Sequence, residues 1–357
     1  CARRTCQDWF PMSSTVSEST FRSRLDRARA EMARTGVDAL ILSLGHDMPY
    51  LTGYLAMPLE RLTMLVILRE GDASLIIPRL EAPRVTEMPS VFSLATWNET
   101  DDPVALAHKL LGSARTIAVG DQMWSRFLVD LLKFRPDAKY VRSVVVMEAL
   151  RSRKDAAEIA ALVAAGAAAD RVAAQLHAGD IPLVGRTEAQ VSADISARLL
   201  AEGHQVVNFA IVAAGENAAS PHHHAGDRVI KHGEIVLCDF GGTMNDYCSD
   251  ITRCVHIGEP PSDIAEAYSV LFESQAAGVA AGIIGSSCAG VDAASRGDID
   301  AAGFGEWFVH RTGHGIGMEA HEDPYMVAGN DTPIAVGHAY SVEPGIYIPG
   351  KWGMRLE

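Results

Sequence analysis

The pattern of apolar residues changes near residue 150, and this change predicts two domains with different architectures. Before it, the spacing of apolar residues predicts a helix over 21–36 and short buried strands over 38–44, 64–68 and 73–77. Helices and strands that alternate in this way are typical of an α/β domain, which we assign to residues 12–150.

The second part of the chain, residues 151–357, has a different pattern. The segment 147–175 is rich in Ala, Glu, Lys and Arg, which predicts one long connecting helix. Beyond it the sequence predicts an α+β domain with an antiparallel sheet. Its expected strands are 206–213, 235–240, 251–257 and 340–348, and its expected helices are 263–283 and 290–302.

Composition excludes several classes of protein. A net charge of -14 over 357 residues disfavours binding to nucleic acid or to an anionic membrane. We find no run of about 20 apolar residues and no apolar core of a signal peptide, so we expect a cytoplasmic protein that spans no membrane. The cysteines form no CxxC pair, and we expect reduced thiols at Cys1, Cys6, Cys238, Cys248, Cys254 and Cys288.

Both ends of the sequence interrupt a pattern. Met12 precedes a polar run typical of a natural start, and Glu357 falls inside a strand-like pattern. We therefore expect the natural protein to begin at Met12 and to continue for at least one more strand.

Two aspartates stand beside apolar runs in the second part. Asp239 follows the run EIVLC, where we expect the strand to end and Gly241-Gly242 to turn the chain, and Asp250 opens the next strand. A hairpin would bring both carboxylates to one end of the sheet. Either aspartate alone is more often a simple turn residue.

Histidines and glycines alternate further on, in HRTGHGIGMEAHE. His310 and His314 have the spacing of two ligands on one helical face, but the glycines at 313, 315 and 317 disfavour a helix. An extended chain whose backbone approaches a ligand fits them better. The alternative is a glycine-rich loop with surface histidines.

Near the end of the chain, Glu343 precedes a proline within an apolar pattern, where an acid is costly unless it is paired or bound to a metal. Arg355 and Glu357 are two residues apart and would share one strand face; a salt bridge is the simpler interpretation of that pair. Two Asp, two Glu and one His suit two closely spaced divalent ions such as Mn²⁺. Such a pair of ions activates water and polarises a carbonyl group.

These stretches resemble the metallopeptidase family of Xaa-Pro dipeptidases (prolidases), aminopeptidase P and methionine aminopeptidase, which has the pita-bread fold. The matching segments follow one another in order and cover nearly all of 221–357: PHHHAGDRVIKHGEIVLCDFGG, DYCSDITR, HRTGHGIGMEAHEDP, SVEPGIY and RLE. The segment LRSRKDAAEIAAL looks like the family's interdomain segment, and ALILSLGHDMPYLTGY is similar to the creatinase/prolidase N-terminal domain.

The resemblance implies the metal ligands residue by residue. Asp239 would bind the first metal ion, and Asp250 would bridge both. His314 and Glu343 would bind the second ion, and Glu357 would be the second bridge.

The resemblance also implies roles around the ions. His222 would contact substrate near the scissile bond, His310 and His321 would line the pocket, and His321 would stabilise the tetrahedral intermediate. Glu343 would serve as general base or proton shuttle, and Arg355 would orient the ligands.

The sequence departs from the family pattern in two places. Asp246 replaces a common glycine before Tyr247, which could alter the turn between the two aspartates. His223 and His224 extend the single expected histidine, and we interpret both as exposed side chains without a role in the site.

The function that the resemblance implies is hydrolysis of Xaa-Pro bonds with two divalent ions, Mn²⁺ first and Co²⁺ or Zn²⁺ as alternatives. The short first domain favours a dipeptidase acting on small peptides with proline second, and the resemblance suggests a homodimer. The alternatives are an aminopeptidase P that takes longer peptides, a small-molecule hydrolase or lyase, and an inactive binding protein on the same fold.

Overall fold

The computed structural model describes residues 16–357, so the expected start at Met12 and the thiols of Cys1 and Cys6 lie outside the described residues. The chain separates into two compact units, the first ending at Arg151 and the second running from Ser152 to Glu357. Each unit has its own buried apolar core, and each is described by itself.

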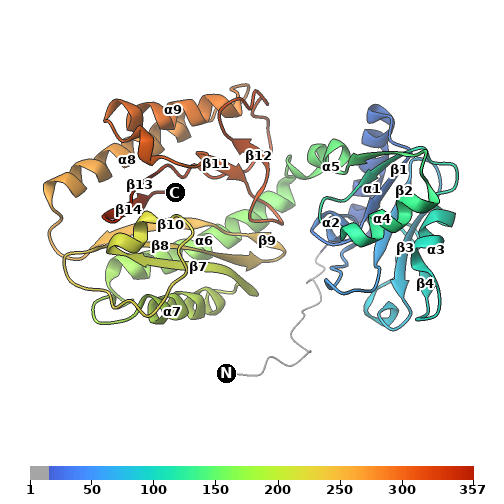
Figure 1. Cartoon of the computed structure of the whole chain (residues 1–357), viewed down its shortest axis with the longest axis horizontal. Coiled ribbons are helices and arrows are strands. Elements are labelled where there is room, and N and C mark those ends of the chain that lie inside the picture. The colour runs from blue at the N-terminus through green and yellow to red at the C-terminus, as the bar shows by residue number, and fades with distance from the viewer. Residues whose placement is uncertain (1–15) are drawn as a thin grey trace. The chain divides into compact units, whose positions relative to one another are not determined.

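Unit 1 is an α/β domain around a six-stranded mixed sheet with strand order β4-β3-β2-β1-β5-β6 (Figure 1). The strands β1, β2 and β3 are antiparallel neighbours, whereas the outer pairs are parallel. The elements are α1 (Glu18–Thr35), β1 (Ala39–Leu42), α2 (Asp47–Thr52), β2 (Met64–Leu68), β3 (Ala73–Pro78), η1 (Ala82–Arg84), β4 (Ser93–Trp97), α3 (Pro103–Leu110), β5 (Thr116–Val119), α4 (Ser125–Phe134), β6 (Lys139–Arg142) and α5 (Val144–Arg151).

The first helix shows how local sequence sets these elements. The Ser17 side chain accepts a hydrogen bond from the Thr20 amide at the start of α1, and Gly36 ends the helix in the left-handed conformation. Phe21, Leu25 and Met32 are buried on one face, which confirms the predicted helix and its apolar face.

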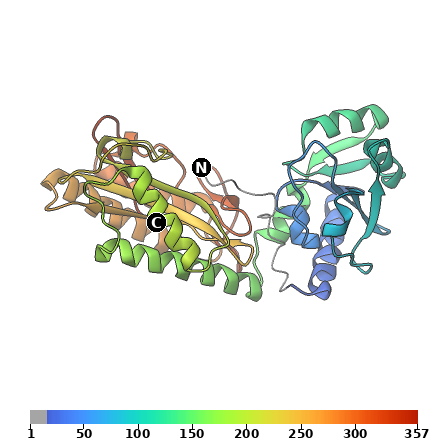
Figure 2. The same cartoon turned by 90° about the horizontal axis from the view of Figure 1, so that it is seen from below.

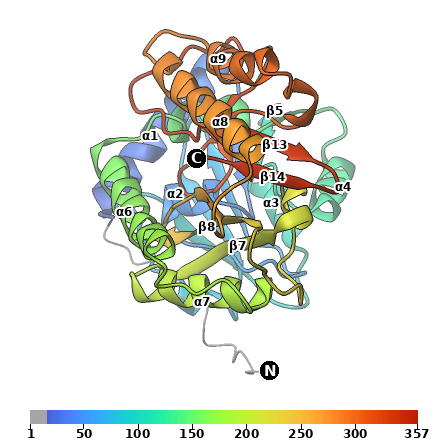
Figure 3. The same cartoon turned by 90° about the vertical axis from the view of Figure 1, so that its left-hand side faces the viewer.

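Unit 2 carries its helices on two sides of a group of strands. The helices α6 and α7 lie on one face of the antiparallel sheet β10-β8-β7 (Figures 1 and 2), and α8 and α9 lie on the opposite side of the strands (Figure 3). The elements are α6 (Ala156–Ala178), α7 (Glu188–Ala201), β7 (Val206–Ala214), η2 (Gly215–Ala219), β8 (Ile235–Met244), β9 (Tyr247–Cys248), β10 (Ile251–His256), α8 (Ser262–Ala281), α9 (Cys288–Ala301), η3 (Gly305–Trp307), β11 (Gly313–Gly315), β12 (Glu322–Met326), β13 (Gly345–Ile348) and β14 (Trp352–Arg355).

The predicted long helix over 147–175 is wrong, because the structure breaks it into α5 and α6. Asp155 begins α6 as a capping residue: its carboxylate accepts hydrogen bonds from the amides of Ala157 and Glu158, and the Glu158 carboxylate bonds back to the Asp155 amide. This capping box satisfies the first amides of α6 and gives the chain a new helix start.

The predicted turn at Gly241-Gly242 is also wrong, because β8 continues through both glycines to Met244. A Cβ at Gly241 would lie 2.1 Å from the Ser249 carbonyl oxygen, so the glycines permit close strand approach. The turn comes at Asn245 and Asp246, whose φ angles are 51° and 70°. Asp246 therefore occupies a left-handed position that glycine adopts more easily, and the departure leaves the hairpin intact.

Two other sequence interpretations need correction. The expected strand over 340–348 is limited to β13, and Tyr340 makes only an isolated bridge with Gly315. The helix α6 is long and apolar enough, by length and composition alone, to cross a membrane, although the sequence analysis found no such segment. One such helix is weak evidence, and here Ala169, Val172 and other residues of α6 are buried in the core of unit 2.

A buried ion pair links the start of unit 2 to β12. Lys154 Nζ lies 2.7 Å from Glu322 Oε1, and these side chains are only 1% and 7% exposed. The Lys154 amide also donates to the carbonyl of Gly337. Removal of one member leaves the other charge buried without this partner.

We predict that Lys154→Met lowers the free energy of unfolding of unit 2 by about 3 kcal/mol or more. The double variant Lys154→Met/Glu322→Gln should recover most of the loss, because neither charge then remains buried. Arg171→Met, which breaks an exposed ion pair with Glu202, is the control and should cost under about 1 kcal/mol. Urea unfolding measures all three, and equal losses for Lys154→Met and Arg171→Met would contradict the prediction.

Candidate metal centre

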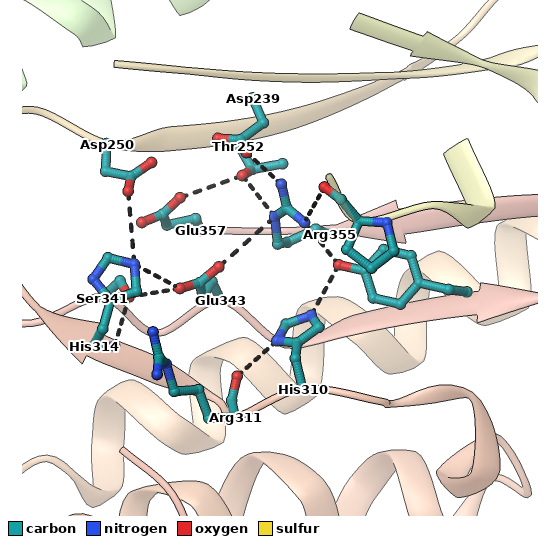
Figure 4. Close-up of polar contacts among 12 residues, drawn as sticks. Asp239, Asp250, Thr252, His310, Arg311, His314, Ser341, Glu343, Arg355 and Glu357 are labelled. Atoms are coloured by element: carbon teal, nitrogen blue, oxygen red, sulfur yellow. Dashed lines mark hydrogen bonds and ion pairs between the residues drawn. The ribbon is translucent and has the colours of Figure 1, made fainter. Parts of the chain in front are cut away.

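Strand pairing brings two carboxylates to one region of the central sheet. Asp239 lies within β8 and pairs in register with Thr252 of β10 on one side and Ile211 of β7 on the other. Asp250 directly precedes β10, so the hairpin places its side chain near that of Asp239 (Figure 4). The two aspartates come together as expected, although Asp239 does not lie at a strand end.

His314 is the middle residue of β11 and is buried. Its Nδ1 lies 3.1 Å from the carbonyl oxygen of Gly315, which can only accept, so Nδ1 carries a hydrogen. Nε2 faces the carboxylates, 3.0 Å from Glu343 Oε1 and 3.7 Å from Asp250 Oδ2, so it would bind a cation held there once it gives up its own hydrogen. This orientation by a backbone carbonyl is the usual way in which proteins prepare a histidine ligand.

Glu343 lies before β13, and Ser341 holds it in place. The Ser341 hydroxyl donates to Glu343 Oε1 at 2.9 Å and accepts from the amide of His314 at 3.1 Å. One serine therefore fixes both the histidine and the glutamate. Glu343 is not part of a strand, and its backbone amide donates a hydrogen bond to the carbonyl of Thr312.

Arg355 and Thr252 hold the remaining carboxylates. Arg355 Nη2 donates to Asp239 Oδ2, and its Nε donates to the Thr252 hydroxyl at 3.0 Å. Thr252 in turn donates to Glu357 Oε2 at 3.3 Å (Figure 4). The pair Arg355 and Glu357 is therefore not a simple salt bridge, because the arginine binds Asp239 and reaches Glu357 only through Thr252.

The donor atoms form two overlapping groups that share Asp250. Asp239, Asp250 and Glu357 offer one carboxylate oxygen each, and these atoms lie within 4.8 Å of one another. Asp250, His314 and His321 form the second group with the same spacing. Glu343 adjoins the second group through His314.

The electrostatics of this cluster fit bound cations. Burial, together with the charges of Glu357, Asp239 and Glu343, raises the pKa of Asp250 well above its ordinary value. Burial, with the charges of Glu343 and Asp239, also raises the pKa of Glu357 well above its ordinary value. Burial raises the pKa of Asp239 too, although the charge of Arg355 acts to lower it. Asp239 Oδ1 is buried without a hydrogen-bond partner. Divalent ions would offset this cost of burying carboxylate charge, because hard cations bind carboxylate oxygens.

Glu343 differs from its acidic neighbours. Burial raises its pKa, but the hydrogen bond and charge of His314, with the charge of Arg355, outweigh burial and lower the pKa to about 2. Glu343 is therefore ionised at neutral pH.

His321 packs on His314, with ring centroids 3.9 Å apart. Arg311 Nη2 lies 3.4 Å from His321 Nδ1, and arginine can only donate, so Nδ1 accepts and Nε2 carries the hydrogen of the neutral ring. Burial, with the charges of His314 and Arg311, lowers the pKa of His321 to about 4. His321 is thus a neutral hydrogen-bond donor at the centre.

His310 is held by hydrogen bonds at both ring nitrogens. Its Nδ1 donates to the carbonyl of Arg311 at 2.7 Å, and its Nε2 accepts from the Tyr347 hydroxyl at 2.9 Å. Tyr347 accepts from Arg355 Nη1 at 2.9 Å. Both ring nitrogens are therefore occupied, and His310 supports Arg355 through Tyr347.

A cavity of about 1250 Å³ opens beside the cluster. His222 is exposed and lines this cavity, as do His310, His314 and His321. Arg355 and most of the acidic cluster line it too: Asp239, Asp250 and Glu343.

The interpretation of His223 as an exposed side chain without a role is wrong. Its Nε2 lies 2.8 Å from Glu188 Oε2, and Glu188 is 0% exposed. Glu188 also accepts from the amides of Ala214 and Gly226. These hydrogen bonds outweigh burial and lower the pKa of Glu188, so a buried carboxylate holds the loop that carries His222.

Sequence reasoning missed Thr252, Tyr347 and Glu188. Thr252 stands two residues after Asp250 in a strand, so it lies on the same strand face, and this period could have identified it. Tyr347 and Glu188 carry no such signal, because they contact His310 and His223, which lie 37 and 35 residues away in the sequence.

The two parts of the chain match two different family models. Residues 154–357 match the model of metallopeptidase family M24, and residues 24–153 match the creatinase/prolidase N-terminal domain. A probable dipeptidase PepE of Mycobacterium tuberculosis is 43% identical over 353 residues, which is 97% of this chain and 92% of the relative.

Two solved structures show the same fold. The dipeptidase PepE from Mycobacterium ulcerans superposes with a TM-score of 0.89 at 42% identity, covering 96% of this chain and 92% of that one. A prolidase from Thermococcus sibiricus superposes with a TM-score of 0.87 at 30% identity, covering 94% and 92%. The expected combination of a creatinase/prolidase-like first domain and a pita-bread second domain is confirmed.

We predict that Thr252→Val lowers the affinity of the protein for Mn²⁺ by about 10- to 100-fold, because Glu357 and Arg355 each lose a hydrogen bond. The matched control is Thr243→Val, which removes a hydroxyl bound to Asn208 in the same sheet. Chelator competition measures both affinities. Equal affinities for the two variants would show that Thr252 does not orient the ligands.

Proposed function

This chain belongs to metallopeptidase family M24, and from that premise we propose that it hydrolyses the Xaa-Pro bond of dipeptides at a centre of two divalent metal ions. It is a metal-dependent hydrolase. The dipeptide specificity, the identity of the metals and the roles of single residues are our proposals. The observation that carries the two-metal centre is the pair of overlapping donor groups that share Asp250.

We propose five ligands for two ions, with Glu343, which adjoins the second donor group, in place of His321. Asp239, Asp250 and Glu357 would hold the first, and His314 and Glu343 would hold the second together with Asp250. When bound, such ions activate water and polarise the substrate carbonyl. The ligand set is mainly carboxylate with one imidazole, which favours Mn²⁺, with Co²⁺ or Zn²⁺ as alternatives.

The surrounding side chains orient these donors. Arg355 fixes Asp239, Thr252 fixes Glu357, and Ser341 fixes Glu343. Because each carboxylate is held by a separate donor, the chain prepares the ligand geometry before an ion arrives.

Glu343 is suited to carry the proton. Its carboxylate lies beside both donor groups, 3.0 Å from His314 Nε2, and we propose that it accepts a proton from water. The hydroxyl of that water adds to the Xaa carbonyl carbon, the C–N bond breaks, and Glu343 delivers the proton to the prolyl nitrogen. Like any amide nitrogen, the prolyl nitrogen leaves as a neutral amine only if it is protonated, and this proton becomes the N–H of the product.

Two histidines would assist on the substrate side. The Nε2–H of His321 can donate to the carbonyl oxygen as negative charge develops on it. His222 is exposed in the cavity and would contact the substrate near the scissile bond. His310, with both nitrogens occupied, would hold Tyr347 and Arg355 in place.

We also propose where the enzyme is located and which partners it has. The mainly apolar cores, the buried thiols of Cys238, Cys248, Cys254 and Cys288, and the net charge of -14 support a cytoplasmic enzyme without nucleic-acid or membrane partners. We expect a homodimer, which light scattering would test. An aminopeptidase P activity remains the second candidate, because the cavity of about 1250 Å³ has room for more than two residues.

The experiment that tests the function is hydrolysis of a substrate panel with Mn²⁺, Co²⁺ and Zn²⁺. We expect Xaa-Pro dipeptides to be cleaved faster than Xaa-Pro tripeptides and far faster than the same dipeptides without proline. Faster cleavage of the tripeptides would assign an aminopeptidase. Cleavage of no prolyl peptide with any of the three ions would contradict the proposal.

We predict that Asp250→Ala abolishes turnover and lowers the bound metal content, because the shared ligand of both donor groups is lost. Elemental analysis of the purified variant measures the metal, and circular dichroism checks that it folds. Asp227→Ala is the control, because Asp227 lies on the same unit and belongs to neither donor group. Normal metal content in Asp250→Ala would remove this residue from the centre.

A further inference from the structure

The loop that carries His222 begins with a tight turn. The His223 amide donates to the Ser220 carbonyl at 3.1 Å, so Pro221 and His222 occupy the two corner positions of the turn. His222 is exposed and lines the cavity, and its side chain forms no hydrogen bond among the residues that the structure describes. Its position in the cavity therefore depends on how the loop around it is held.

The loop is bound to the metal centre directly before His222. Arg355 Nη1 lies 3.4 Å from the carbonyl oxygen of Pro221, and Nη2 of the same guanidinium donates to Asp239. The carbonyl of Pro221 belongs to the peptide bond that joins it to His222. The backbone of His222 is thus next to the arginine that orients a proposed metal ligand.

Directly after His222 the loop is bound to a buried carboxylate. His223 Nε2 lies 2.8 Å from Glu188 Oε2. The hydrogen bonds of Glu188 outweigh burial and lower its pKa, so it is ionised at neutral pH and can only accept, and Nε2 of His223 carries the hydrogen. Of two neighbouring histidines, His222 is therefore exposed in the cavity, whereas His223 binds the loop to the body of unit 2.

Glu188 also holds the segments on both sides of the turn. Its Oε1 accepts from the Ala214 amide and from the side-chain amide of Asn217, each at 2.9 Å. Its Oε2 accepts from His223 and, at 3.3 Å, from the Gly226 amide. Glu188 is the first residue of α7, where the helix dipole favours a negative charge. One carboxylate on a regular helix thus fixes the chain before and after the turn.

We propose that Glu188 and His223 are positioning residues, which hold the turn so that His222 faces the substrate. This inference rests on the proposed function, in which His222 contacts the substrate near the scissile bond. A displacement of about 1 Å in such a contact can lower turnover about 100-fold. Loss of the His223 hydrogen bond would release one side of the turn while Arg355 still holds the other, so the fold and the metal ligands would remain.

The test compares two variants with side chains of nearly the same length. His223→Gln keeps an N–H donor for Glu188, whereas His223→Met removes it. We expect His223→Met to lower kcat on alanylproline by about 10- to 100-fold, with KM and bound Mn²⁺ almost unchanged, and His223→Gln to keep most of the activity. Equal losses of kcat in the two variants would overturn the proposal, because the hydrogen bond to Glu188 would then have no part in turnover.

A double variant shows whether His223 acts through His222. His222→Ala/His223→Met should be no slower than His222→Ala alone, because the group that His223 positions is already absent. Additive losses would show that His223 affects turnover by another route, and would overturn the proposal. The control is His232→Met, which removes an exposed histidine of the same unit outside the cavity and should keep wild-type turnover.

Hydrogen exchange separates this proposal from the proposed function, because it needs no substrate. The amides at positions 223 and 226 should exchange about 10-fold faster in His223→Met than in the wild type or in His223→Gln. If the wild type cleaves no prolyl peptide but these amides respond in this way, the function is wrong and the contact with Glu188 still holds the loop. If the amides exchange equally in all three proteins, Glu188 and His223 do not position the turn, whatever the activity.

Discussion

The second unit is organised around the mutual repulsion of buried carboxylates. Asp239, Asp250, Glu343 and Glu357 lie in one buried region, and burial alone disfavours the charge on each. One fixed cation, Arg355, compensates part of this charge. The remainder is what gives the site its affinity for divalent cations, so a feature that is unfavourable for an isolated fold is the basis of the chemistry.

Supporting contacts extend outward from that cluster through short polar chains. Arg355 is held by Tyr347, Tyr347 is held by His310, and the carbonyl of Arg311 holds the His310 ring. His310 and Arg311 therefore contact different parts of the site. The backbone of Arg311 fixes the acidic side through His310, and its guanidinium faces the cavity.

The sequence predicted the helices and strands in which apolar residues follow a regular pattern. It also predicted acidic residues of the site. The helix over 21–36 follows from apolar spacing, because it buries one face, and the strands at 64–68 and 73–77 follow from short apolar runs, because they are buried on both faces. Glu343 was identifiable because a charge within an apolar pattern needs compensation, and Asp250 because a hairpin would bring it beside Asp239. By contrast, the break before Asp155 depends on a capping box that an alanine-rich helical pattern conceals. The partner of His223 could not be predicted, since Glu188 lies 35 residues away and no local rule joins them.

The proposed centre is assembled from distant parts of the sequence, since its ligand Asp239 and the arginine that orients it, Arg355, are 116 residues apart. Contacts of such long sequence separation close large loops, and that entropic cost delays them in folding. The metal centre should therefore be among the last parts of unit 2 to form. An ion that binds there recognises only chains whose strands are already paired in the correct register, so it stabilises the finished fold and does not guide its assembly.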